Sequence, residues 1–205
     1  MGIKAVVTDF GGVLVRTGKP VGRQKWDSIL KLEPGTLERL VFGSEEAAKA
    51  TLGELPESAI WESLAAKFQL DSQAIRQLED DFWSDDRLDT VLVEFLESLR
   101  PAYQIAILSN AWPNARKSFK NQYRLDRLAD PIIISAEEGL AKPDPRIFER
   151  TAARLGAEMN GIVFLDDFPL NVRAAASLGI HAVQFRSTAQ AIEDIKRILS
   201  LPQDN

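Results

Sequence analysis

The side chains of this sequence that could do chemistry together lie in a few short stretches, each in a loop or directly after an apolar run. They are Asp9, Ser109 with Asn110, Lys142, and the pair Asp166-Asp167. A carboxylate can act as a nucleophile and as a ligand for a hard cation, while hydroxyl, amide and ammonium groups hold a phosphoryl group. The set predicts phosphoryl transfer in which Asp9 attacks phosphorus and forms an aspartyl-phosphate.

A cation is expected among these residues because a bare cluster of three carboxylates would repel itself. Asp9, Asp166 and Asp167 offer the hard oxygen ligands that suit Mg²⁺. The glycines that follow Asp9 let the backbone approach a ligand closely, and the amides of this turn are expected to be free to bind phosphate. The predicted phosphate-binding residues are Gly11, Gly12, Ser109, Asn110 and Lys142.

Five short apolar runs predict the strands that position these residues. They are Ala5–Thr8, Ile105–Leu108, Ile132–Ile134, Ile162–Leu165 and Ala182–Phe185. Runs that are apolar throughout are typical of strands buried on both faces, and helical patterns lie between them. This alternation predicts an α/β fold with a Rossmann-like, doubly wound parallel sheet. Ligands of such sheets bind beyond the carboxyl ends of the strands, where Asp9, Ser109 and Asp166 would meet.

Residues 16–86 interrupt the alternation because they show helical patterns and no convincing strand. Ile60, Trp61, Leu64 and Phe68, for example, share one helical face. We interpret residues 16–86 as a small all-helical insert, and residues 1–15 and 87–205 as the Rossmann-like core domain.

The composition limits the classes of protein to which the chain can belong. It has 205 residues, 45% hydrophobic and 27% charged, which is typical of one globular domain with a smaller insert. A net charge of -5 without a basic block disfavours a nucleic-acid or membrane partner. The absence of Cys excludes a disulfide scaffold and a thiolate metal site. The first apolar run is too short for a signal peptide or an anchor, so the expected location is the cytoplasm.

Taken together, these stretches resemble the haloacid dehalogenase superfamily of hydrolases over nearly the whole chain. The first motif of that family is an apolar run followed by Asp, any residue, Asp and Gly, and here it reads Asp9-Phe10-Gly11-Gly12. The later motifs correspond to Ser109, to Lys142 in KPDPRIF, and to the acidic pair in FLDDFPLNV. The resemblance implies a Mg²⁺-dependent phosphatase of small phosphorylated metabolites, with the helical insert as a cap over the site.

The sequence departs from the family pattern at Gly11, where the family usually has a second Asp. That Asp usually protonates the leaving group, and its main-chain carbonyl binds the metal, so the resemblance implies that Gly11 keeps the carbonyl ligand and lacks the acid. General acid–base catalysis typically contributes about 10²–10⁴-fold. We therefore expect slow hydrolysis of phosphate esters that have poor leaving groups. The rate should be reduced least for acyl, aryl or anomeric sugar phosphates. Asp27, a residue of the cap or a water molecule is a candidate replacement.

Two other functions are consistent with the missing acid. The dehalogenase branch of the family also lacks the second Asp, attacks carbon with the first Asp and uses no metal. The pair Asp166-Asp167 argues against that branch, because an anionic substrate would meet uncompensated charge there. A non-catalytic protein that binds a phosphorylated metabolite is the second alternative.

Several residues near the motifs also have structural interpretations. Asp144 is predicted to cap a helix, and Asn171 is either a helix cap or a site residue. His181, the only histidine, is predicted to be structural. Trp112 and Phe168 follow site loops, where they either line the pocket or pack against other residues. The tryptophans of the insert are predicted to pack inside it: Trp26, Trp61 and Trp83.

Overall fold

The strands of the computed structural model, which describes residues 2–202, form one parallel sheet and one small antiparallel sheet. The parallel sheet has the order β5-β4-β1-β6-β7. Its strands are β1 (Ala5–Thr8), β4 (Gln104–Ser109), β5 (Ile132–Ile134), β6 (Ile162–Asp166) and β7 (His181–Gln184). The chain adds strands first on one side of β1 and then on the other, which confirms the predicted doubly wound sheet. Each predicted strand is present, with ends within one residue of those expected.

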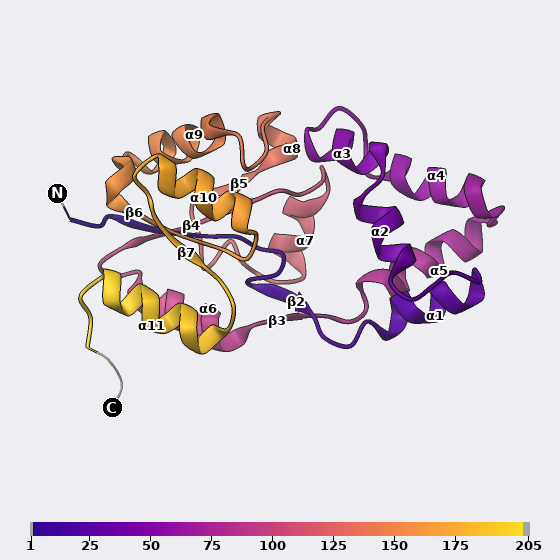
Figure 1. The fold of residues 1–205 in the computed structure, drawn as a ribbon, viewed down its shortest axis with the longest axis horizontal. Coiled ribbons are helices and arrows are strands. Elements are labelled where there is room, and N and C mark those ends of the chain that lie inside the picture. Colours follow the sequence, from indigo (N-terminus) through magenta and orange to yellow (C-terminus); the bar gives the residue numbers. More distant parts are fainter. Residues whose placement is uncertain (1, 203–205) are drawn as a thin grey trace.

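Helices cover both faces of this sheet (Figure 1). The core carries α6 (Thr90–Leu99), α7 (Ala115–Asn121), α8 (Ser135–Glu138), α9 (Pro145–Leu155), α10 (Pro169–Ser177) and α11 (Thr188–Ile198), with a 3-10 turn at Met159–Gly161. Helices α6 and α11 lie on one face, and α9 and α10 lie on the other. No helix among residues 2–202 is both long and apolar enough to cross a membrane.

The alternation of side chains along β1 divides the core into two layers. Val6 belongs to the apolar cluster that includes Leu96 of α6 and Ile195 of α11. Ala5 and Val7 belong to the opposite cluster, which includes residues of α9 and α10. Because β1 is central and buried on both faces, its carboxyl end is held in a fixed position, and Asp9 follows directly.

The segment between β1 and β4 contains two strands that the sequence did not indicate. They are β2 (Val15–Thr17) and β3 (Asp86–Leu88), which pair antiparallel with Thr17 opposite Asp86. The expectation of no strand between residues 16 and 86 was therefore wrong at both ends. Strands of three residues contain too few positions to show a periodic pattern.

Five helices lie between these two strands, which agrees with the helical patterns predicted there. They are α1 (Val21–Ile29), α2 (Thr36–Phe42), α3 (Glu45–Thr51), α4 (Ser58–Phe68) and α5 (Ser72–Trp83). Residues 18–85, which we call the helical segment, have an apolar cluster of their own. Trp26 and Trp61 are buried in it and Trp83 packs against it, as predicted.

The small sheet is tied to both parts of the molecule. On the core side, Arg16 Nη2 lies 2.6 Å from Asp89 Oδ2, at the N-terminus of α6. On the other side, Nη2 of Arg23 in α1 donates a hydrogen bond of 3.3 Å to Asp86 Oδ1 of β3, which also accepts one of 2.5 Å from Thr17 Oγ1 of β2. The chain thus enters and leaves the helical segment at neighbouring, hydrogen-bonded positions.

Candidate active site

Asp9 lies directly beyond the carboxyl end of β1, with 8% of its surface exposed. Its N–H donates to the carbonyl of Leu165 on β6, and its Oδ1 accepts a 2.7 Å hydrogen bond from the N–H of Phe10. The ring of Phe10 packs into the core against Phe119, at a centroid distance of 4.0 Å. This packing fixes the turn and leaves the Asp9 carboxylate at the edge of the sheet where Ser109 ends β4.

Lys142 joins two of the predicted carboxylates. Its Nζ lies 2.9 Å from Asp9 Oδ1 and 2.6 Å from Asp166 Oδ2, and donates a 2.9 Å hydrogen bond to the carbonyl of Leu108. These three partners engage all three N–H donors of the ammonium group. A phosphate oxygen would therefore bind Lys142 by replacing one of these partners.

Burial dominates the electrostatics of Asp9. It raises the pKa of the carboxyl from 3.8 to about 7; Lys142 opposes this rise, and Asp166 adds to it. Burial also raises the pKa of Asp167, and Asp166 raises it further. The elevated pKa values show that the attraction of Lys142 does not fully offset the cost of burying these carboxylates.

Asp166 is fully buried, and its oxygens are already occupied. Besides Lys142, it accepts a 2.8 Å hydrogen bond from the N–H of Phe168 and two of 3.1 Å from Nδ2 of Asn171. Asn171 lies within α10 and does not cap it, so the site interpretation of this residue is the one the contacts support. Asp144 does cap α9, as predicted, by accepting from the N–H of Arg146.

Asp9, Asp166 and Asp167 each offer a carboxylate oxygen, and these oxygens lie within 4.8 Å of one another. Three carboxylates around one ammonium group leave a net charge of about −2 when all are ionised. Hard oxygen donors with that charge fit Mg²⁺. Asp167 is the exposed member of the cluster, so its oxygens are the most accessible to an ion.

Both the backbone conformation at position 12 and the neighbouring Asp167 carboxylate favour glycine there. Its φ of +77° lies in the left-handed region, and a Cβ there would stand 2.2 Å from Asp167 Oδ2. The N–H of Gly12 donates to the carbonyl of Val15, and the N–H of Phe10 is used by Asp9. The expectation that these two amides are free to bind phosphate was therefore wrong.

We expect Gly12→Ala to lower Mg²⁺ affinity by about 10–100-fold, the usual cost of disturbing a group that positions a metal ligand. The new methyl group must displace the Asp167 carboxylate. Affinity is measured by the rise of the melting temperature with Mg²⁺ concentration. Gly179→Ala is the matched control, since its φ of +86° imposes the same backbone strain with no atom within 4 Å of the added Cβ. Equal affinities in the two variants would contradict this role of Gly12.

The Asn110 side chain has a different contact from the one predicted. Its Oδ1 accepts from the N–H of Lys142 and its Nδ2 donates to the Lys142 carbonyl, both at 2.8 Å. Asn110 therefore holds the backbone of Lys142 in place through both polar atoms of its side chain. Ser135 is a residue that the sequence analysis missed: its buried hydroxyl bonds both backbone groups of Ala111, next to Asn110.

Gly11 differs from Gly12 because neither its backbone nor its surroundings require glycine. A Cβ at this position meets no atom within 4 Å, and its φ is not in the left-handed region. Asp27 does not supply the missing acid in this structure. It is buried in the helical segment, where its two oxygens accept from the N–H groups of Gly35 and Leu37 at 2.7 and 2.8 Å.

His181, which was predicted to be structural, has an ordinary backbone contact, and Trp112 and Phe168, whose roles were left open, differ in exposure. His181 begins β7, and its Nε2 lies 3.1 Å from the carbonyl of Asn160. Trp112 is buried and packs into the apolar cluster of the helical segment, whereas Phe168 is 53% exposed.

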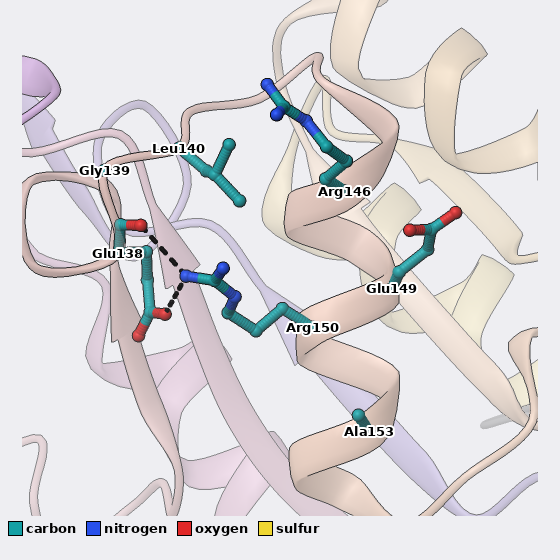
Figure 2. Close-up of a pocket in the computed structure, with 7 residues that line it drawn as sticks. All are labelled: Glu138, Gly139, Leu140, Arg146, Glu149, Arg150 and Ala153. Carbon is teal, nitrogen blue, oxygen red and sulfur yellow. Dashed lines mark hydrogen bonds and ion pairs between the residues drawn. The ribbon is translucent and has the colours of Figure 1, made fainter.

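An open hollow of about 570 Å³ lies between the end of α8 and helix α9 (Figure 2). Its two arginines are already ion-paired: Arg150 lies 2.9 Å from Glu138, and Arg146 lies 2.6 Å from Asp144. None of the predicted site residues lines this hollow, so it is distinct from the site around Asp9.

Comparisons with known proteins identify the family of the chain. The model of the haloacid dehalogenase-like hydrolases matches residues 3–179. Phosphatase MT3486 of Mycobacterium tuberculosis is 27% identical over 213 residues, which cover 98% of this chain and 95% of that protein. Acyl-CoA dehydrogenase family member 10 of Mus musculus is 34% identical over 115 residues, but these span 55% of this chain and 10% of that protein.

The fold has solved counterparts as well. A HAD family enzyme of Bacteroides thetaiotaomicron, in complex with magnesium and inorganic phosphate, superposes with a TM-score of 0.76. It is 22% identical, with 90% of this chain and 95% of that chain covered, so this likeness concerns the fold. The family match spans most of the chain and includes all four motifs that meet around Asp9. The chain therefore belongs to the haloacid dehalogenase-like hydrolases.

Proposed function

We propose that this hydrolase cleaves small phosphate monoesters with the help of Mg²⁺ and with Asp9 as the nucleophile. The observation that carries the proposal is the cluster of Asp9, Asp166 and Asp167 around the ammonium group of Lys142. The names of two similar proteins support it, since one is a phosphatase and the other was solved with magnesium and phosphate.

The residues present fit a Mg²⁺ ion. Asp9, Asp167 and the Gly11 carbonyl would hold it, because the Asp166 oxygens are already hydrogen-bonded within the protein. When bound, Mg²⁺ would offset negative charge on the transferring phosphoryl group.

In the first chemical step, an oxygen of Asp9 forms a bond to phosphorus as the bond to the leaving oxygen breaks. The leaving oxygen departs as an alkoxide with the electron pair of that bond and takes a proton from water. A second water molecule then hydrolyses the aspartyl-phosphate, which releases inorganic phosphate and regenerates Asp9. Lys142 and Ser109 hold the phosphoryl oxygens. Because residue 11 is glycine, the leaving oxygen receives no proton from that position, so the rate depends strongly on how well the leaving group bears charge.

Residues 16–86 are proposed to act as a cap that closes over this edge of the sheet. The helical segment reaches the core at Trp112 and again at Gly53, where a Cβ would stand 2.1 Å from the carbonyl of Ala136. Both contacts lie just beyond strands β4 and β5, next to Ser109 and Ser135. A small phosphorylated metabolite in the cytoplasm is the proposed substrate.

The test is hydrolysis of 4-nitrophenyl phosphate with Mg²⁺ and with a chelator. We expect turnover that requires Mg²⁺, because the charge of the cluster otherwise repels a phosphate dianion. Halide release from 2-chloropropionate, assayed alongside without metal, tests the dehalogenase alternative. Halide release without phosphatase activity would overturn the proposal, and phosphate binding without turnover would favour the non-catalytic alternative.

A further inference from the structure

A group of aromatic rings stands beside the loop that follows β4. Trp112 lies 5.7 Å from the ring of Phe42 and 5.9 Å from that of Trp83, measured between centroids. Phe42 is also 5.9 Å from Trp83 and 5.5 Å from Phe82. We call Phe42, Trp83 and Trp112 the aromatic wall.

Phe42 is unusual within this group because nearly half of it faces outward. It is 48% exposed although three aromatic neighbours pack against it, whereas Trp112 is 9% exposed. A large ring that is held by neighbours and leaves one side uncovered offers a preformed apolar surface to a ligand.

Trp112 connects this surface to the loop that positions Lys142. It is two residues beyond Asn110, whose side-chain amide is hydrogen-bonded to the backbone of Lys142. The Lys142 ammonium in turn lies 2.9 Å from Asp9. The wall is therefore attached to the same loop, beyond β4, that holds a residue of the candidate site in place.

Other exposed apolar side chains gather at the same edge. Leu52 precedes Gly53, which touches the backbone of Ala136, and is 37% exposed. Phe168 and Leu170, at 53% and 50%, directly follow Asp167. Four of the seven large apolar residues exposed among the described part of the chain thus either follow a site residue closely or belong to a segment that contacts the core just beyond β4 or β5.

From these observations we infer that the substrate is a phosphate monoester with an apolar, aromatic leaving group that packs against Phe42. This inference rests on the proposed phosphatase function and names its substrate class. It agrees with Gly11, since a phenolate departs without the proton that residue 11 does not provide. The wall binds the ring while Asp9 attacks the phosphorus and the phenol oxygen leaves with its electron pair.

The experiment is kcat/KM for phenyl phosphate and its 4-methyl, 4-ethyl and 4-propyl derivatives with Mg²⁺. These phenols have nearly equal acidity, so the series changes apolar area and keeps the leaving group constant. We expect kcat/KM to rise at least about twofold per carbon, against about fourfold for a completely buried methylene group. Phe42→Ala should remove the dependence on chain length, and Phe42→Leu should retain most of it.

Ile29→Ala is the matched control, because Ile29 is a 52% exposed apolar residue on α1 outside the wall, and its series should follow the wild type. A wild type that hydrolyses every member equally well would overturn this inference and leave the phosphatase proposal standing. A wild type that hydrolyses none of them would overturn this inference, and the phosphatase proposal falls with it only if 4-nitrophenyl phosphate is not hydrolysed either. If kcat/KM rises with chain length as steeply in Phe42→Ala as in the wild type, the wall is excluded as the cause of that rise. The wild-type series remains informative even if Phe42→Ala does not fold.

Discussion

Replacing Asp9 with asparagine is expected to abolish phosphate-ester hydrolysis and to stabilise the metal-free protein. Asparagine has nearly the same shape but cannot form the acyl phosphate, so kcat should fall by at least about 10⁴-fold, as when other covalent nucleophiles are removed. The loss is measured with 4-nitrophenyl phosphate at saturating Mg²⁺. Activity within tenfold of the wild type would rule out Asp9 as the nucleophile.

The gain in stability follows from the pKa of Asp9. Burial raises this pKa to about 7 in the folded protein, above the ordinary value of 3.8. The folded state therefore holds this proton more tightly than the unfolded state, and ionised Asp9 lowers stability progressively from about pH 4 to pH 7, then by a constant amount. The neutral amide of the variant carries no such penalty. At pH 8 with chelator, Asp9→Asn should melt higher by at least about 2–4 °C, the shift that about 1 kcal/mol produces at this chain length.

The matched control is Asp144→Asn. Its hydrogen bonds with Arg146 lower the pKa of Asp144 to about 2, the opposite direction, so this substitution should not raise the melting temperature. The advantage of Asp9→Asn should vanish near pH 4, where the wild-type carboxyl is protonated, and should shrink when Mg²⁺ binds the wild type. A lower melting temperature for Asp9→Asn at pH 8 would show that the Lys142 contact outweighs the burial of charge.

The second large effect is a gain of activity in Gly11→Asp. A side chain at position 11 has open space and an ordinary φ, so an aspartate can be accommodated without moving the turn. It would supply the acid that the turn lacks. For alkyl phosphates, whose alkoxide is a poor leaving group, kcat/KM should rise by up to about 10²–10⁴-fold. For 4-nitrophenyl phosphate, whose leaving group needs no proton, the change should be much smaller.

The ratio of kcat/KM for an alkyl phosphate to that for 4-nitrophenyl phosphate is therefore the quantity to measure. Gly11→Asn is the matched variant, with the same shape and no acidic proton. If both variants changed the ratio equally, the effect would come from shape or polarity, and the missing acid would not explain the substrate limits of the wild type.

The sequence predicted the five strands of the main sheet and the residues at their ends because buried parallel strands are continuously apolar. Val6, Ile107 and Leu165 lie in continuously apolar runs, and polar residues stand at or directly after the ends of these strands, namely Asp9, Ser109 and Asp166. The sheet topology then required these ends to meet, so the composition of the site followed from local signals.

The side-chain partners could not be predicted in the same way, because they depend on contacts between residues far apart in the chain. Asn110 and Lys142 are joined through backbone and amide groups, and Asn171 was equally compatible with a cap or a site role. Asp27 was one candidate for the acid missing at position 11, and only its contacts within the helical segment show that it is used elsewhere. Strand β3 has no apolar pattern and exists through its pairing with β2.

That pairing bears on how such a chain can diversify over generations. Thr17 and Asp86 face each other, so the chain leaves the small antiparallel sheet and returns to it at a single point on its border. Insertions with adjacent ends are tolerated because they do not require the host to move. The helices can therefore be mutated or exchanged without moving the strands that hold Asp9 and its neighbours, so the two parts of the chain can change under separate selection.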